Sequence, residues 1–485
     1  MQNLESKTTS GVFWSFCERF LSKGIGVITT LFLAWFLVPE DYALIAMLAV
    51  FISLSSVLVD AGLGQALIRK LEVSELELNT VFYTNLVLSG LIYLICYFAA
   101  PLISEFYAEP RLILLIRVVL FSVFLQSLIV IQKTVLVRAL NFKDQLKVIL
   151  PASFGSSLIA IILAYLNFAE WALIFQIIFY QLFLSISYWR LKLWRPSFQF
   201  SFTALMGLWR FASYIVFDSM ISIPFQNMYL ITLPKYFAAG PVGIYFFAQK
   251  IKVILIEFIV GAVQSVTYPA LSKLQDDNVR LKKSYRTLIK VTTYLIFPMI
   301  MFSCALAPLL FEVLLPENWY GAAIYLQLML IASILYPINS INLNILKVKG
   351  RSDLIFYIGV VKKLIIISIF IYTLNFGIIE IIIGQIAASI INYLPNVYFT
   401  SRLINYSAKE QLGDFIPVLI ISVLIAAGIY WLEPILGINP SIKLILLSLL
   451  ALFLYVLFTA IFNFQAYNLA KDLFFKYRNK TITPK

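Results

Sequence analysis

Residues 442–462 read IKLILLSLLALFLYVLFTAIF, an unbroken apolar stretch with a single charge at Lys443. A bilayer core of about 30 Å is crossed by about 20 apolar residues in a helix. Lipid offers no hydrogen-bond partners, so a spanning segment must be helical or part of a closed barrel. This stretch is too long, and too apolar on both faces, for a barrel strand. It therefore predicts a transmembrane helix.

The same pattern fills the rest of the chain. Of its 485 residues, 61% are hydrophobic and 13% are charged, whereas a soluble domain carries about 25% charged residues. We expect an all-α integral membrane protein of about fourteen transmembrane helices with little soluble structure. The apolar runs lie at 12–38, 42–61, 80–99, 112–131, 148–166, 169–188, 206–234, 242–265, 288–310, 322–345, 355–375, 379–399, 415–432 and 442–462.

The basic residues predict the orientation of these helices. Most of the 37 Lys and Arg residues fall in loops on one side, and the opposite loops hold only Arg111 and Lys235. Basic loops stay in the cytoplasm, so both termini are expected there. The net charge of +13 is thus explained by topology, and no nucleic-acid partner is expected.

Several kinds of chemistry have no residues to support them. The sequence contains no histidine, which removes the commonest catalytic base and metal ligand. Its three cysteines, Cys17, Cys96 and Cys304, all lie inside apolar runs, which argues against a disulfide framework or a thiolate metal cluster. No nucleotide-binding P-loop is present. We expect no enzyme activity, no catalytic residue, no metal and no cofactor.

A weak internal repeat divides the chain. Residues 37–43 (LVPEDYA) link the first two predicted spans, and residues 239–245 (AGPVGIY) link the seventh and eighth. Duplicated helix sets around a central site are typical of transporters. The sequence therefore predicts a six-helix half at 1–200, a second at 201–405, and two extra helices with a basic cytoplasmic tail at 406–485.

Charged side chains inside the apolar runs are the candidate site residues. An ionised group near the bilayer centre is costly, so it usually faces a watery cavity or a partner. Arg19 and Lys23 are four residues apart and share one helix face. Lys250 and Glu257 are two turns apart and also share a face. A cavity walled by these helices is net cationic, which suits a phosphate-bearing headgroup.

The full candidate set also includes residues with a simpler explanation. Arg210 lies near a predicted cytoplasmic end and alternatively reaches the interface. Glu18 alternatively neutralises a neighbouring cation. Lys252, Lys362 and Lys363 are weaker candidates. The expected anion-binding residues are Arg19, Lys23, Lys250 and Arg210, and those for ion coupling or charge balance are Glu18, Asp218 and Glu257.

Short motifs recur in a fixed order along most of 1–400. The most distinctive is YPALSKLQDD at 268–277, and each motif is weak alone whereas the order and spacing are specific. The others are SGVFWS at 10–15, PEDY at 39–42, DAGL at 60–63, ALIR at 66–69, VGIY at 242–245, PENW at 316–319 and GRSD at 350–353. In this pattern the chain resembles the polysaccharide (Wzx-type) flippases of the multidrug/oligosaccharidyl-lipid/polysaccharide exporter superfamily. It is most similar to the colanic-acid and teichuronic-acid exporter branch, from which Trp35 and Ala43 depart.

The resemblance implies two six-helix bundles facing each other in a V, with two further helices outside. It implies a flippase in the bacterial cytoplasmic (inner) membrane that moves an undecaprenyl-diphosphate-linked oligosaccharide to the outer leaflet by alternating access, driven by an ion gradient. The diphosphate is then expected against the cavity bases. The expected partners are this lipid-linked oligosaccharide and membrane lipids, with a polysaccharide polymerase and glycosyltransferases as candidate protein partners.

Two other functions remain open on the sequence alone. An extruder of small cationic drugs shares the superfamily, but its cavity should favour carboxylates over bases. A membrane-embedded glycosyltransferase or polymerase needs a sizeable outer loop carrying acids, and the predicted outer loops are short, about 5–15 residues.

Overall fold

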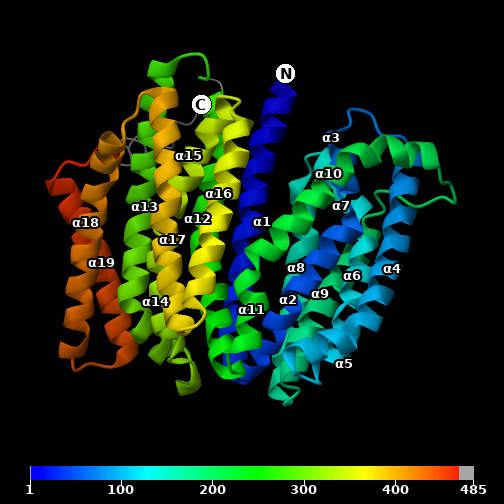
Figure 1. The fold of residues 1–485 in the computed structure, drawn as a ribbon, viewed down its shortest axis with the longest axis horizontal. Helices are drawn as coiled ribbons and strands as arrows, with labels where there is room; N and C mark the ends of the chain where they lie inside the picture. The colour runs from blue at the N-terminus through cyan, green and yellow to red at the C-terminus, as the bar shows by residue number, and fades with distance from the viewer. Residues whose placement is uncertain (1, 273, 469–485) are drawn as a thin grey trace, which may run out of the picture. The chain divides into compact units, whose positions relative to one another are not determined.

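The computed structural model describes the backbone of residues 2–272 and 274–468. The side chains of 2–13, 15, 16, 19, 257–266, 268–270 and 352 lie outside the described set. Every regular element in the described residues is helical (Figure 1), so the expected all-α class is confirmed. The elements are α1 (Gln2–Ala34), α2 (Pro39–Asp60), α3 (Leu63–Arg69), α4 (Glu75–Tyr107), α5 (Leu112–Val119), α6 (Phe121–Ser127), α7 (Val130–Arg138), α8 (Phe142–Tyr165), α9 (Glu170–Arg190), α10 (Phe202–Gln226), α11 (Met228–Tyr236), α12 (Ala239–Ser272), α13 (Asn278–Leu314), η1 (Glu317–Trp319), α14 (Ala322–Ala332), α15 (Tyr336–Val348), α16 (Ser352–Thr373), α17 (Ile378–Ile404), α18 (Ala408–Leu432), η2 (Glu433–Ile435) and α19 (Pro440–Ile461).

The protein is a multi-pass membrane protein. Within the described residues, twelve helices are long and apolar enough to cross a bilayer, or thirteen if the bent pair Leu112–Ser127 and Val130–Arg138 forms one span. The described apolar part of α1, Phe20–Ala34, is shorter. Each of the fourteen expected runs coincides with a helix or a broken helix pair, although the count of fourteen spans is not confirmed.

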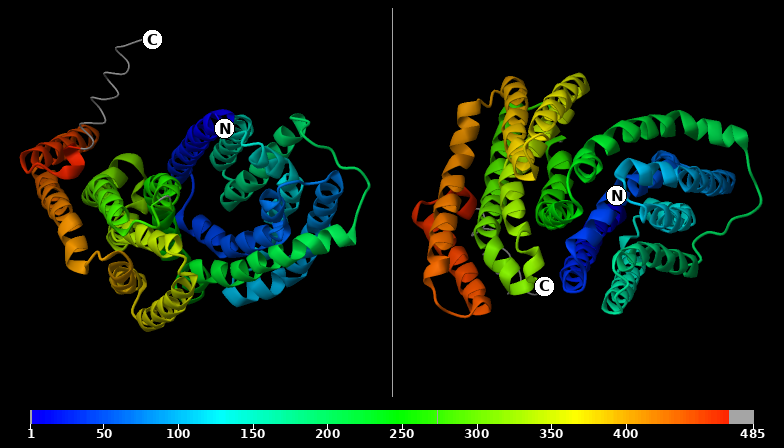
Figure 2. Two further views of the ribbon diagram at one scale, coloured as in Figure 1. Left: turned by 90° about the horizontal axis from the view of Figure 1, so that it is seen from above. Right: turned by 60° about the horizontal axis from the view of Figure 1, so that its bottom comes forward.

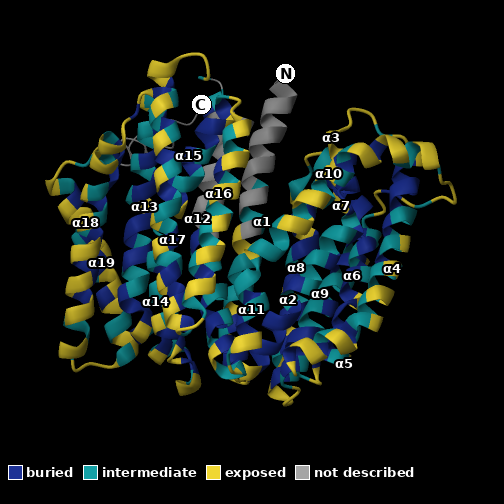
Figure 3. Cartoon of the chain, viewed as in Figure 1, coloured by how far each residue is buried: buried dark blue, intermediate teal, exposed yellow. Residues whose placement is uncertain are grey.

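Outward faces of the helices carry large apolar side chains, as a lipid contact requires. On α4 the exposed residues Val87, Leu91, Ile95, Phe98 and Leu102 recur every three to four positions and form one stripe. Exposed positions on α4, α18 and α19 are visible in yellow in Figure 3. Such a surface would be unstable in water, which supports insertion in a bilayer.

The chain forms two compact units, Met1–Phe247 and Ala248–Lys485. In the first unit, α8 packs on both α1 and α9, and α2 packs on α4, α10 and α11 (Figures 1 and 2). A core cluster that includes Leu67, Phe82, Trp194 and Ala212 joins α3 and α4 to α10. The expected division at 200 and 405, and the V arrangement of two halves, stay predictions.

In the second unit, the long helix α13 packs on α14, α18 and α19, and α17 packs on α14, α15 and α16. Ion pairs fasten α13 to α18: Lys282 to Glu410 at 3.0 Å, and Arg286 and Lys290 to Asp414 at 2.7 and 3.1 Å. Helix α18 is therefore fixed to α13 by charge as well as by the apolar core of this unit.

The two turns of the internal repeat contact each other inside the first unit. A Cβ on Gly240 would lie 2.8 Å from Oε1 of Glu40, and the rings of Tyr42 and Phe247 meet edge to face at 5.6 Å. Two segments about 200 residues apart therefore form one small interface, at the end of the unit that holds the expected outer loops.

Candidate functional site

The expected site residues of α1 lie against the first unit. Glu18 is partly buried, and its charge acts electrostatically on the phenols of Tyr180 and Tyr188 of α9. Lys23 is partly buried. The side chain of Arg19 lies outside the described residues. Helix α1 thus has a charged section at mid-length where it packs on α8.

On α10, Arg210 and Asp218 are both exposed, and they share their side of the helix with Tyr214, Phe217 and Ile221. The opposite side packs on α2, α3 and α4 through buried residues such as Leu208 and Ala212. A span that exposes a base and an acid usually turns them toward water or a partner. This face of α10 is therefore a candidate cavity wall.

Lys250 belongs to the second unit and lies partly buried on α12. The side chain of Glu257 on the same helix lies outside the described residues. That Arg19, Lys23, Lys250 and Arg210 share one chamber stays a prediction. Among the described residues, no group of three or more His, Cys, Asp or Glu side chains could hold a metal ion.

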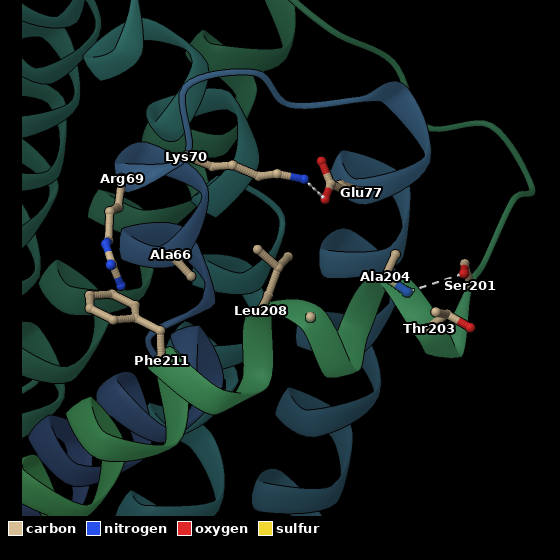
Figure 4. Close-up of a pocket in the computed structure, with 10 residues that line it drawn as sticks. Ala66, Arg69, Lys70, Glu77, Ser201, Thr203, Ala204, Leu208 and Phe211 are labelled. Carbon is tan, nitrogen blue, oxygen red and sulfur yellow. Dashed lines mark hydrogen bonds and ion pairs between the residues drawn. The ribbon is translucent and has the colours of Figure 1, made fainter.

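A cavity of about 550 Å³ lies at the end of the first unit that is expected to be cytoplasmic (Figure 4). Arg69 and Phe211 form one wall, with the guanidinium carbon 4.6 Å from the ring centre. Lys70 crosses the opening and pairs with Glu77. The remaining lining residues are Ala66, Ser201, Thr203, Ala204, Gly207 and Leu208.

Arg138, the last residue of α7, holds the segment that carries Arg69 and Lys70 in place. Its guanidinium donates hydrogen bonds to the carbonyl oxygens of Leu67, of Lys70 at 2.5 Å and of Leu71 at 3.0 Å. A cation at these carbonyls satisfies acceptors that the C-terminal end of α3 leaves free. The result is a fixed, basic cavity mouth that suits an anionic group.

A second cavity, of about 480 Å³, lies within the second unit between α15, α16 and α17. Lys362 of α16 donates a hydrogen bond to Oδ1 of Asn396 at 2.7 Å, and Nδ2 of Asn396 donates to Oδ1 of Asn339 at 3.0 Å. Sequence reasoning treated Lys362 as a weak candidate and missed both asparagines. The signal was present as polar residues at helical spacing from Asn339 to Lys347.

Comparisons with known proteins find a family and relatives named for polysaccharide biosynthesis. Residues 32–324 match the sequence profile of the family described as polysaccharide biosynthesis protein. The lipopolysaccharide biosynthesis protein WzxC of Escherichia coli (strain K12) is 25% identical over 423 residues, which cover 84% of each chain. The succinoglycan biosynthesis transport protein ExoT of Rhizobium meliloti (strain 1021) is 26% identical over 73% of this chain and 72% of its own.

Among solved structures, the lipid II flippase MurJ in its inward closed conformation has a similar fold. The TM-score is 0.74 at 16% sequence identity, over 94% of this chain and 98% of that chain. At this identity the match concerns the fold, and it extends beyond the residues matched by the family profile to nearly the whole chain.

Proposed function

Because the chain belongs to the family of polysaccharide biosynthesis proteins, and the motif resemblance is thereby confirmed, we propose that it is a flippase for lipid-linked oligosaccharide. The cargo is an undecaprenyl-diphosphate-linked repeat unit destined for a surface polysaccharide. The family match over residues 32–324 is the observation that carries this proposal. A transporter named for succinoglycan biosynthesis and a lipid II flippase fold support it.

The transported molecule has three parts, and each needs a different environment. The lipid tail stays in the bilayer, and the sugar unit needs a wet path across it. The diphosphate carries the charge that makes unassisted crossing slow. We propose that Arg19, Lys23, Lys250 and Arg210 hold the diphosphate, since arginine offers a fork of donors and lysine a point charge.

Charge balance and coupling are assigned to the acidic residues of the same helices, Glu18, Asp218 and Glu257. The exposed acid and base on α10 support a watery wall on that side of the helix. Transport then proceeds by alternating access between the two repeats. We place the protein in the inner membrane with both termini in the cytoplasm, where a polymerase and glycosyltransferases are its candidate partners.

Complementation tests the proposal. A strain that lacks its own repeat-unit flippase should regain surface polysaccharide when the full chain is expressed. Lys23→Ala and Arg19→Ala should each reduce that polysaccharide at least about tenfold, the loss expected when a charge-assisted hydrogen bond disappears. Lys147→Ala, which removes only an exposed ion pair with Asp144, is the matched control. Normal polysaccharide in both cavity variants, at unchanged protein levels, contradicts the site assignment.

The alternative of a multidrug extruder of the same superfamily predicts a different result. Cationic drugs bind to carboxylates, whereas the candidate cavity residues carry a net positive charge. Expression of the chain in a drug-sensitive strain should leave the inhibitory concentrations of cationic dyes unchanged. A clear rise in those concentrations, without restored polysaccharide, would favour the extruder.

A further inference from the structure

One face of α15 lines the cavity of the second unit along nearly the whole helix. Its positions follow the spacing of a single helix face, and the distance from the first to the last is about 16 Å at 1.5 Å per residue. The opposite face is mainly apolar and packs into the core through residues such as Ile338, Ile341 and Ile345, with Asn342 among them accepting a hydrogen bond from Tyr285. The lining residues are Tyr336, Asn339, Ser340, Leu343, Asn344 and Lys347.

The wall across from α15 brings a lysine into this polar space. Lys362 lies near the middle of α16 and is held by Asn396, which is only 2% exposed and is itself tied to Asn339. Among the described residues, no carboxylate lies within ion-pair distance of Lys362 or Lys347. A lysine in a span usually pairs with an acid or a carbonyl group or faces a water-filled cavity, so a lysine in a polar cavity without an acid can bind an anionic ligand.

Asn344 provides a second sign of a missing ligand. The residue is 7% exposed, it lines the cavity, and its Nδ2 has no hydrogen-bond acceptor among the residues that the structure describes. Buried amide donors in folded proteins are almost always satisfied, by protein, water or ligand. Lys362, Lys347 and Asn344 together offer N–H donors without an acidic acceptor, which is the environment that suits an anionic oxygen.

We propose that this cavity binds an anionic oxygen group of the transported glycolipid, with Lys362 and Asn344 as the central contacts and Lys347 at one end of the stripe. The amide and hydroxyl groups along α15 then contact sugar hydroxyls next to that group. The cavity volume lies within the range of about 300–1,000 Å³ that is usual for small-molecule sites. This inference rests on the proposed flippase function, and it adds a cargo subsite outside the residues assigned to the diphosphate there.

Two parts of such a cargo carry anionic oxygens, the lipid diphosphate and an acidic sugar. Binding of two probes to the purified full chain in detergent distinguishes them: undecaprenyl diphosphate without sugar, and a soluble glucuronate-containing disaccharide. Lys362→Met should weaken binding of one probe about tenfold or more, as expected for the loss of a charge-assisted contact. The probe that responds identifies the group.

Matched variants separate binding from folding. Lys363 is the next residue of the same helix and does not line the cavity. Lys363→Met should therefore leave the affinity for the probe unchanged. Asn344→Asp keeps the size of the side chain but places an acid in the cavity, so it should weaken the same probe. If Lys362→Met does not yield folded protein, Lys362→Arg and Asn344→Asp still test the site, with thermal unfolding as the check on folding.

The inference is overturned if neither probe binds the unaltered chain. It is also overturned if the Lys362 and Asn344 variants bind the probes as tightly as the unaltered chain, or if Lys363→Met loses as much affinity as Lys362→Met. Complementation distinguishes this failure from that of the proposed function. If the unaltered chain restores surface polysaccharide and the cavity variants bind both probes normally, the flippase function stands and only this subsite is rejected. If the unaltered chain restores no surface polysaccharide, the proposed flippase function is rejected.

Discussion

Gly243 and Pro39 approach so closely that a Cβ on Gly243 would lie 1.7 Å from the carbonyl oxygen of Pro39. Pro39 begins α2 and Gly243 lies in the first turns of α12, so this contact joins the turns of the two sequence repeats. No side chain larger than hydrogen fits here without a backbone shift, because the obstacle is the main chain. The contact therefore explains why glycine stands at this position of the second repeat.

Gly243→Ala should lower the thermal stability of the detergent-purified protein. Forcing a methyl group into a packed contact costs about 1–3 kcal/mol. Differential scanning fluorimetry measures the effect as a lower Tm. Gly90→Ala in α4 is the control, since a Cβ there meets nothing within 4 Å. Equal melting temperatures for the Gly243 variant and the unaltered protein would show that the two turns separate easily.

Asp414→Asn should loosen α18 from α13. The carboxylate of Asp414 is only 6% exposed, and it accepts hydrogen bonds from Arg286 at 2.7 Å and from the Tyr406 hydroxyl at 2.5 Å, besides its ion pair with Lys290. Breaking a buried ion pair costs about 3–5 kcal/mol, and partial exposure of the two bases reduces this to about 1–3 kcal/mol. Limited proteolysis between α17 and α18 measures the loosening. Asp353→Asn, at an exposed pair with Arg351, should have little effect.

Arg138→Ala should free the segment from Leu67 to Leu71. The variant loses the guanidinium that donates to four backbone carbonyls in this segment. Losing about 1.4 kcal/mol of local stability raises amide hydrogen exchange about tenfold. Arg138→Lys should restore only part of the protection, because a lysine lacks the fork of donors. Hydrogen exchange with mass spectrometry measures the segment, and Lys192→Ala serves as a control outside it. Unchanged exchange in Arg138→Ala would mean that α3 needs no such support.

Cysteine labelling should reveal the orientation of the loops. Leu71 and Phe376 lie in turns expected on opposite sides of the membrane, and both are highly exposed. In a background with Cys17, Cys96 and Cys304 replaced by serine, Phe376→Cys should react in whole cells with a maleimide that cannot cross the membrane in which the protein lies. Leu71→Cys should react only after the cells are opened. The reverse pattern would place both termini outside.

Most of the fold could be predicted from the sequence, because spanning a bilayer leaves an apolar run wherever a helix crosses. The places where a helix breaks within an apolar run could not be predicted. The run at 206–234 contains the change from α10 to α11 at Asn227, and the run at 322–345 contains the change from α14 to α15. Pro337, in the first turn of α15, was visible as a proline, but membrane helices tolerate proline without breaking. Only the packing around it decides the outcome.

The candidate site was less accessible to sequence reasoning. Lys347 lies just beyond the apolar run at 322–345, and the asparagines of α15 lie inside that run. A polar stripe of this kind becomes meaningful once Lys362 and Asn396 are known to lie across from it, and no sequence spacing relates three separate helices. The charges on α1 and α10 were easier to identify because ionised residues are rare in spans.

The interface between the repeat turns also has an evolutionary consequence. In a duplicated protein the two copies are usually free to drift apart, each under its own constraints. Here Pro39 and Gly243 are neighbours. A larger residue in place of Gly243 therefore requires the backbone at Pro39 to move away. Related sequences should therefore show paired changes at these two turns. Any relative with a larger residue at the Gly243 position should also have a different backbone conformation at the start of α2.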